Sequence, residues 1–178
     1  PGLRSRIRCV TAGGKGIGRG DTLQNLHASE YAFWTGDKAG TLLGLLQAVP
    51  ALPGTMVIIE STANGFDDFK RRWDAAAAGL SDFRAVFFAW WENPDYAMPA
   101  PAGMRLSREE IALQKAFNLT PEQLQWRRWC IQNNCGGDEA LFRQEYPATP
   151  EEAFLTSGRP VFQNAEILPR REKAPRPK

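Results

Sequence analysis

The chain has 178 residues, of which 43% are hydrophobic and 24% are charged. No apolar run approaches the roughly eighteen residues that a membrane-spanning helix needs, so we expect a soluble globular protein with no membrane partner. The net charge of +2 neither requires nor excludes a nucleic-acid partner. The three cysteines have no metal-site or paired spacing, which predicts reduced thiols in a cytosolic compartment.

A glycine-rich stretch, Gly13–Gly20, follows a short β-prone segment at Ile7–Val10. Its Gly13–Gly18 part is similar to the nucleotide loop of short-chain dehydrogenases, in which backbone amides approach a pyrophosphate. That motif requires a helix directly after the loop, whereas this sequence continues as a predicted strand. The sequence also contains no Tyr-x-x-x-Lys pair and no Gly-x-x-x-x-Gly-Lys-Ser/Thr loop. We therefore favour a flexible loop and keep a dinucleotide-binding oxidoreductase as an alternative.

Strands and helices alternate through the first half of the chain. The predicted strands are Leu23–Ala28, Met56–Ile59 and Phe83–Trp90. The predicted helices are Asp37–Val49 and Phe66–Ala78, and Gly79 ends the second of them. Crossovers of this length favour a parallel sheet with right-handed connections. The sequence therefore predicts an α/β domain over residues 1–92.

The second half carries start signals of short helices. Capping boxes are predicted where a Ser or Thr precedes a Glu or Gln by three residues, and an Asp can cap a further helix that runs to Glu145. These helix starts are at Ser107, Thr120, Asp138 and Thr149. We expect a small helical subdomain over residues 93–158. The basic, proline-punctuated residues 159–178 are typical of an extended linker.

Two predicted strands end in polar residues, Ser29-Glu30 and Glu60–Gly65. The carboxyl ends of neighbouring parallel strands form one crevice, so the sequence predicts a shared site. Glu30 is the candidate catalytic residue, because a carboxylate at a strand end can orient or deprotonate the water that attacks a γ-phosphate. The alternative is a surface glutamate at a strand–loop junction.

Four residues are candidates for nucleotide binding: Ser29, Ser61, Thr62 and Asn64. Small hydroxyls can sense a phosphate or its bound water by hydrogen bonding. Ser29 can also hold a magnesium-bound water, although a neutral hydroxyl does not offset the charge of the metal. The alternative for the second segment is a turn in which Asn64 or Gly65 caps the following helix.

Other chemically notable residues favour structural roles. His27, the one histidine, is interpreted as a core residue on the same side of its strand as Ser29. The pairs Arg71-Arg72 and Arg127-Arg128 favour solvated helix faces over contacts with DNA phosphates. We expect Trp90, Trp91, Trp126 and Trp129 to pack in the core and between subdomains. No DNA-binding residue is predicted.

Several segments of the sequence resemble the large terminase subunits of tailed phages and prophages. Leu26–Trp34 resembles their Walker B region, and Pro53–Gly65 resembles motif III, the ATPase coupling motif. Three later segments also resemble the family, namely Phe87–Trp90, Gln125–Arg128 and Gln144–Phe154. The resemblance covers Ile7–Phe162. Its specific part is the combination of Glu-Ser-Thr-Ala-Asn-Gly with Glu-Tyr-Pro-Ala-Thr-Pro-Glu-Glu-Ala-Phe.

The resemblance implies a P-loop ATPase with a parallel sheet that drives viral DNA into a procapsid and is fused to a nuclease. It implies ATP and Mg²⁺ as cofactors of the complete protein. The implied partners are double-stranded viral DNA, a small terminase subunit and the portal or procapsid, in the cytoplasm of a bacterial host. By position, Glu30 resembles the catalytic glutamate, Ser29 stands where the family has the Walker B aspartate, and Ser61–Ala63 resembles the coupling motif.

The Walker A loop of such a protein would precede Pro1, and its nuclease motifs would follow Lys178. We therefore expect a middle fragment, with part of a P-loop NTPase-like α/β domain followed by the small helical subdomain. We expect no tightly bound cofactor and no ATP turnover from this chain alone. A non-catalytic prophage remnant that keeps the fold is a further alternative.

Overall fold

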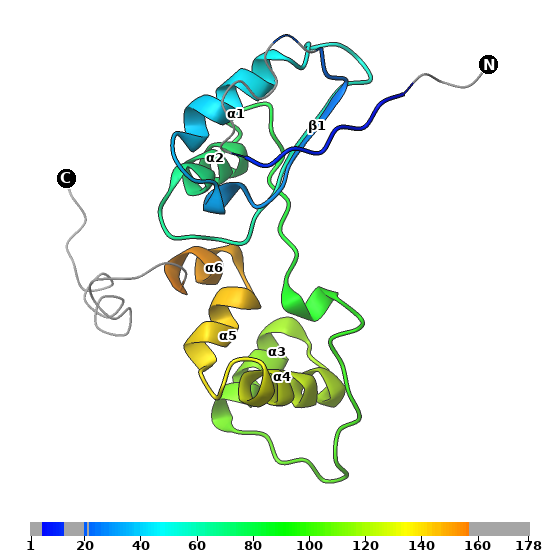
Figure 1. Cartoon of the computed structure of the whole chain (residues 1–178). Helices are drawn as coiled ribbons and strands as arrows, with labels where there is room; N and C mark the ends of the chain where they lie inside the picture. Colours follow the sequence, from blue (N-terminus) through cyan, green and yellow to red (C-terminus); the bar gives the residue numbers. More distant parts are fainter. Residues whose placement is uncertain (1–4, 13–19, 21, 157–178) are drawn as a thin grey trace, which may run out of the picture. The chain divides into compact units, whose positions relative to one another are not determined.

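The computed structural model describes residues 5–12, 20 and 22–156. Within these residues the chain is mixed α/β, with a two-stranded parallel sheet and six α-helices (Figure 1). It divides into two compact units. Of the described residues, those up to Thr62 together with Asp67–Phe69 form the sheet unit, and Ala63–Phe66 together with Lys70 to Thr156 form the helical unit. The Gly13–Gly18 loop and the predicted linker over 159–178 lie outside the described residues.

Strands β1 (Asn25–Ala28) and β2 (Met56–Ile59) form the sheet. They pair in parallel, with Ala28 opposite Ile59, which confirms the predicted orientation. Their hydrogen bonding continues beyond the strands, because Glu60 N–H donates to the Ala28 carbonyl at 3.0 Å and Tyr31 N–H donates to the Glu60 carbonyl at 3.1 Å. The two carboxyl ends therefore meet at one edge of the sheet.

Helix α1 (Lys38–Gln47) follows the predicted 37–49 segment and packs against the sheet (Figure 1). It begins at Lys38 because the Asp37 side chain accepts a hydrogen bond from Gly40 N–H at 2.9 Å. Leu42 of this helix is fully buried against Ala28 and Tyr31. Complete burial of a leucine side chain stabilises a fold by about 2 kcal/mol, so this contact fixes the helix on the sheet.

Helix α2 (Asp68–Ala77) begins in the sheet unit and continues into the helical unit. The helix ends just before Gly79, as predicted. Gly79 has a φ of +69°, and Leu80 N–H donates back to the Ala75 carbonyl at 2.8 Å. Such a left-handed residue satisfies the last helical carbonyls, and glycine adopts it without steric cost.

The predicted third strand over residues 83–90 is wrong. Residues 83–89 have no regular secondary structure, and residues 90–92 form a short 3-10 turn, η2 (Trp90–Glu92). Val86 and Phe88 are exposed, whereas the Phe87 ring contacts Trp73 at a centroid distance of 6.3 Å. Aromatic and branched residues favour extended backbone, but a strand also needs a neighbour that supplies ladder hydrogen bonds. The part of the chain that the structure describes supplies none here.

The described part of the helical unit contains four further helices, and the predicted cap residue accepts a backbone N–H at each of their starts. Ser107 and Glu110 exchange hydrogen bonds, as do Thr120 and Gln123, and Asp138 accepts from two backbone N–H groups. At the fourth start, Thr149 accepts from Glu152 N–H at 3.2 Å. The helices are α3 (Arg108–Phe117), α4 (Pro121–Asn133), α5 (Glu139–Glu145) and α6 (Pro150–Thr156).

A cluster of aromatic rings forms the core of the helical unit. Trp90 stacks on Trp126 at 5.7 Å, and Phe142 meets both tryptophans edge-on at 5.9 and 6.1 Å. Tyr96 also stacks on Trp126, at a centroid distance of 4.3 Å. The core roles predicted for Trp90 and Trp126 are confirmed, whereas Trp129 is 41% exposed.

The paired arginines of α4 are not a solvated face, which corrects that prediction. Arg127 is buried, pairs with Glu139 and lies 5.2 Å from the Phe142 ring centroid. Arg128 pairs with Glu110 through two nitrogens, each 2.6 Å from a carboxylate oxygen. Burial alone would raise the pKa of Glu139, but the neighbouring arginines hold it below its ordinary value. Partnership with a carboxylate makes burial of an arginine tolerable.

Replacement of Glu110 by Gln should make this unit less dependent on pH. The Arg128 hydrogen bonds outweigh burial and lower the pKa of Glu110 from 4.5 to about 2. A carboxyl group with a lowered folded pKa stabilises the fold above its unfolded pKa, and this contribution is lost as the pH falls from about 5 to about 2. We expect Glu110→Gln to cost about 1–3 kcal/mol at pH 7.

The measurement is urea unfolding at several pH values. The difference between the parent and the Glu110→Gln variant should shrink toward zero at the acid end of this range. Glutamine can still serve the capping box, so loss of the cap does not account for the effect. An equal difference at pH 7 and pH 2.5 would contradict the assignment.

Candidate functional site

The residues that follow β1 and β2 meet at the carboxyl edge of the sheet. Ser29 and Glu30 follow β1, and Ser61 lies in the segment after β2. Ala32 N–H donates to the Ser61 hydroxyl oxygen at 3.1 Å, which ties the two segments together. Since Ala28 and Ile59 are paired at the strand ends, this proximity follows directly from the parallel register.

Glu30 has an unusual backbone conformation for a glutamate. Its φ and ψ are 53° and 39°, in the left-handed region, and its side chain is exposed. This conformation costs a residue with a Cβ about 1–2 kcal/mol. Among the described non-glycine residues only Asn118 shares a positive φ, and Asn118 ends α3, where asparagine is well tolerated. Glu30 has no such helix-ending role.

Side-chain and backbone bonds hold the turn that carries Glu30. Phe33 N–H donates to the Glu30 carbonyl at 3.0 Å, which closes the 3-10 turn η1 (Tyr31–Phe33). The Trp34 indole N–H donates to the Ser29 carbonyl at 2.8 Å. These bonds leave the Glu30 carboxylate facing solvent at the strand end. A carboxylate in that position can accept a proton from an attacking water.

The predicted nucleotide-binding residues have different surroundings. Thr62 and Ser29 are exposed, and Asn64 is half-buried. Ser61 uses its oxygen to accept from Ala32 N–H, and its hydroxyl proton can still be donated. The alternative in which Asn64 or Gly65 caps the next helix is wrong, because α2 begins at Asp68 and neither residue directly precedes it.

His27 is exposed and pairs with Glu60, so its interpretation as a core residue is wrong. The His27 Nε2 and Glu60 Oε1 atoms are 3.3 Å apart, and the two side chains are 59% and 45% exposed. β1 turns its Ala28 toward α1, and the alternation of a strand then turns His27 to the open face. An exposed pair of this kind contributes little to stability.

Sequence reasoning missed the side chains that anchor η1 to the start of α2. The Tyr31 hydroxyl donates to Asp68 at 2.5 Å, and the Lys38 ammonium donates to Asp67 at 2.5 Å. These pairs are separated by 37 and 29 residues, so no local pattern predicts them. The one available signal was the position of Tyr31 directly after the candidate catalytic residue.

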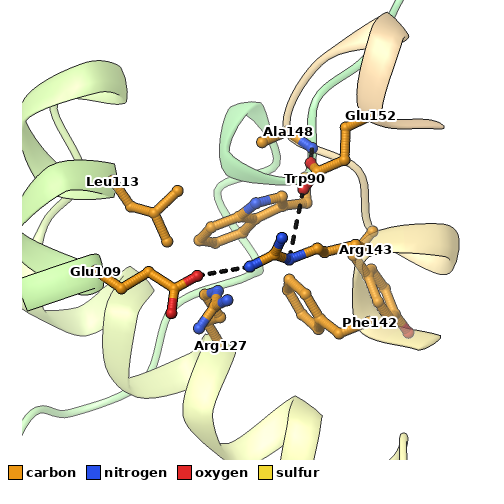
Figure 2. Close-up of a pocket in the computed structure, with 9 residues that line it drawn as sticks. Trp90, Glu109, Leu113, Arg127, Phe142, Arg143, Ala148 and Glu152 are labelled. Atoms are coloured by element: carbon orange, nitrogen blue, oxygen red, sulfur yellow. Dashed lines mark hydrogen bonds and ion pairs between the residues drawn. The ribbon is translucent and has the colours of Figure 1, made fainter. Parts of the chain in front are cut away.

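The helical unit contains a cavity of about 210 Å³ (Figure 2). The Arg143 guanidinium lies between Glu109 and Glu152, with nitrogen–oxygen distances of 2.5 and 3.8 Å (Figure 2). Arg143 also pairs with Glu139 at 2.8 Å, and these carboxylates raise its pKa. The charges around this cavity therefore satisfy one another and link α3, α5 and α6.

Within residues 5–12, 20 and 22–156, no group of three or more His, Cys, Asp or Glu side chains is arranged to hold a metal ion. No helix in the same ranges is long and apolar enough to cross a membrane. All three cysteines, Cys9, Cys130 and Cys135, are free thiols. Comparisons of the chain with protein-family models, with curated proteins and with solved structures found no match.

Proposed function

We propose that this chain is the later part of the ATPase domain of a terminase large subunit, which couples ATP hydrolysis to the movement of viral DNA. The proposal combines the sequence resemblance with one structural observation. The segments that follow two parallel strands meet at one sheet edge, and Glu30 is held there in a strained conformation. Residues held in such conformations concentrate at functional sites, because the surrounding structure must bear their cost.

The proposed chemistry assigns a separate role to each segment. Glu30 accepts a proton from the water whose oxygen attacks the γ-phosphorus of ATP, and ADP leaves. Thr62 and the Ser61 hydroxyl proton serve as hydrogen-bond partners for the phosphate or its water. Thr62 is exposed, and Ser61 is fixed by Ala32 N–H. These contacts sense the nucleotide without holding it tightly.

The described residues are compatible with Mg²⁺ that is bound mainly through nucleotide phosphates. Magnesium usually keeps several waters and takes only one or two protein oxygens in such sites. Ser29 is the exposed oxygen donor next to Glu30 and would contact a magnesium-bound water. The ion would neutralise charge on the transferred phosphoryl group. Viral DNA, a small terminase subunit and a portal or procapsid are the proposed partners.

The deciding experiment compares this chain with the complete subunit encoded by its gene. We expect Mg²⁺-dependent ATP hydrolysis from the complete subunit and none above background from the 178-residue chain, since the sequence contains no P-loop to hold the β- and γ-phosphates. An upstream Gly-x-x-x-x-Gly-Lys-Thr in the reading frame would identify the missing loop.

Two results would contradict this proposal. A complete subunit with no ATP hydrolysis in the presence of DNA and Mg²⁺ would remove the assigned activity. Hydrolysis by the isolated chain that disappears in Glu30→Gln would show that the phosphates are held by residues within the chain. An assay of phosphate release measures ATP hydrolysis by the complete subunit and by the isolated chain.

A further inference from the structure

Two partly buried contacts join Tyr31 of η1 and Lys38 of α1 to Asp68 and Asp67 at the start of α2. The Tyr31 hydroxyl donates to the Asp68 carboxylate at 2.5 Å, and Tyr31 is fully buried. The Lys38 ammonium contacts Asp67 at 2.5 Å, and these two side chains are only 19% and 16% exposed. The Lys38 ammonium also donates to the Ala32 carbonyl at 2.9 Å. Charge-assisted hydrogen bonds shielded from water are stronger than those at the surface.

The same turn is bonded to the end of β2. Tyr31 N–H donates to the Glu60 carbonyl, and Ala32 N–H donates to the Ser61 hydroxyl oxygen at 3.1 Å. Glu60, Ser61 and Asp68 are therefore all bonded to Tyr31 or Ala32, the two residues directly after Glu30.

The arrangement of the rings supports the same anchoring. The Tyr31 ring contacts Trp34 at 5.2 Å and Phe69 at 6.4 Å, both edge-on. Phe69 belongs to the first turn of α2. The Trp34 indole N–H donates to the carbonyl of Ser29, the residue before Glu30. Tyr31 thus has a packing role through its ring and a separate anchoring role through its hydroxyl. Tyr31→Phe separates the two.

We propose that Tyr31 and Lys38 are positioning residues of the Glu30 site. Through their contacts with Asp68 and Asp67, together with the contacts of the same turn with Glu60 and Ser61, they hold Ser61 and Thr62 at a fixed position beside Glu30. They do not touch the reacting atoms. This inference rests on the function proposed above, because positioning matters only where Glu30 and the Ser61-Thr62 segment act on one substrate. It adds residues that the sequence resemblance did not assign.

The first test uses this chain and does not depend on ATP. Hydrogen exchange of the amides over residues 62–69 should become on the order of tenfold faster in Tyr31→Phe, because one buried hydrogen bond to a charged group is lost. Amides of α5 should exchange at the parent rate. Tyr96→Phe removes a tyrosine hydroxyl from the helical unit and serves as the matched control. Unchanged exchange over residues 62–69 would overturn the inference.

The second test uses the complete subunit. Tyr31→Phe and Asp68→Ala, each of which removes the hydroxyl–carboxylate hydrogen bond, should each lower kcat for ATP hydrolysis on the order of tenfold, with KM nearly unchanged. The double variant should be no slower than either single variant, because both remove the same contact. If the contact were purely structural, the variants would lower the melting temperature. They would not lower kcat with KM unchanged, and the double variant would not match the single variants. Lys38→Met provides an independent variant if Tyr31→Phe fails to fold.

The outcomes separate this inference from the proposed function. If Glu30→Gln is inactive while Tyr31→Phe, Asp68→Ala and Lys38→Met turn over at the parent rate, the positioning role is wrong and the function stands. If the complete parent subunit hydrolyses no ATP, the proposed function is wrong. If Glu30→Gln hydrolyses ATP at the parent rate, the catalytic role of Glu30 is wrong and the positioning inference fails with it. Additive losses of the two single variants would also overturn the shared contact.

Discussion

In the complete subunit, Glu30→Gln is expected to lower kcat for ATP hydrolysis by about a hundredfold to ten-thousandfold. The amide keeps the size of the side chain but cannot accept the proton of the attacking water. Glutamine has no more steric conflict than glutamate at the observed φ of 53°, so the backbone strain is unchanged. Nucleotide affinity should stay near the parent value, because the loss falls on the chemical step.

The measurement pairs phosphate release with an ATP-binding titration. Glu60→Gln is the matched control, since Glu60 also follows a strand at the same sheet edge but pairs with His27. We expect this control to keep most of the parent rate. Equal rates for the parent and Glu30→Gln would mean that the strained glutamate serves the fold alone.

The largest effect on stability is expected for Phe142→Ala, at about 3–5 kcal/mol. Phe142 is 2% exposed and contacts the rings of Trp90, Trp126 and Tyr146. Truncation removes these contacts together with the ring on which the Arg127 guanidinium lies. The remaining side chains are large and rigid, so the cavity cannot collapse fully.

Urea unfolding followed by far-ultraviolet circular dichroism measures this loss. Leu141→Ala is the control, because the neighbouring residue is 38% exposed and buries less apolar surface. Its cost should stay below about 1.5 kcal/mol. Equal destabilisation by the two substitutions would show that the aromatic cluster does not stabilise the helical unit as its contacts indicate.

Features set by neighbouring residues could be predicted from the sequence. The Ser107–Glu110 and Thr120–Gln123 capping boxes form as expected, and Gly79 ends α2. Each depends on groups within a few residues, so composition and spacing determine it. The parallel pairing of β1 and β2 was also predictable, because a helical crossover between short strands permits little else.

The candidate site was predictable only in outline. The sequence alone indicated that Glu30 and Ser61 follow neighbouring strands. The left-handed backbone of Glu30 and the contact between Ala32 and Ser61 were not predictable. Both depend on how the turn is fastened to residues on another strand, which no local pattern encodes.

By itself, then, the sequence determined the positions of the strands that pair, the helix caps and the polar residues at the strand ends. Only the tertiary structure decided that residues 83–89 form no strand, that Arg127 is buried, and that Tyr31 is anchored to Asp68. The physical reason is the same in each case. A ladder needs a partner strand, a buried charge needs an opposite charge, and a hydroxyl needs an acceptor. In this chain those partners come from other elements, and folding alone brings them into contact.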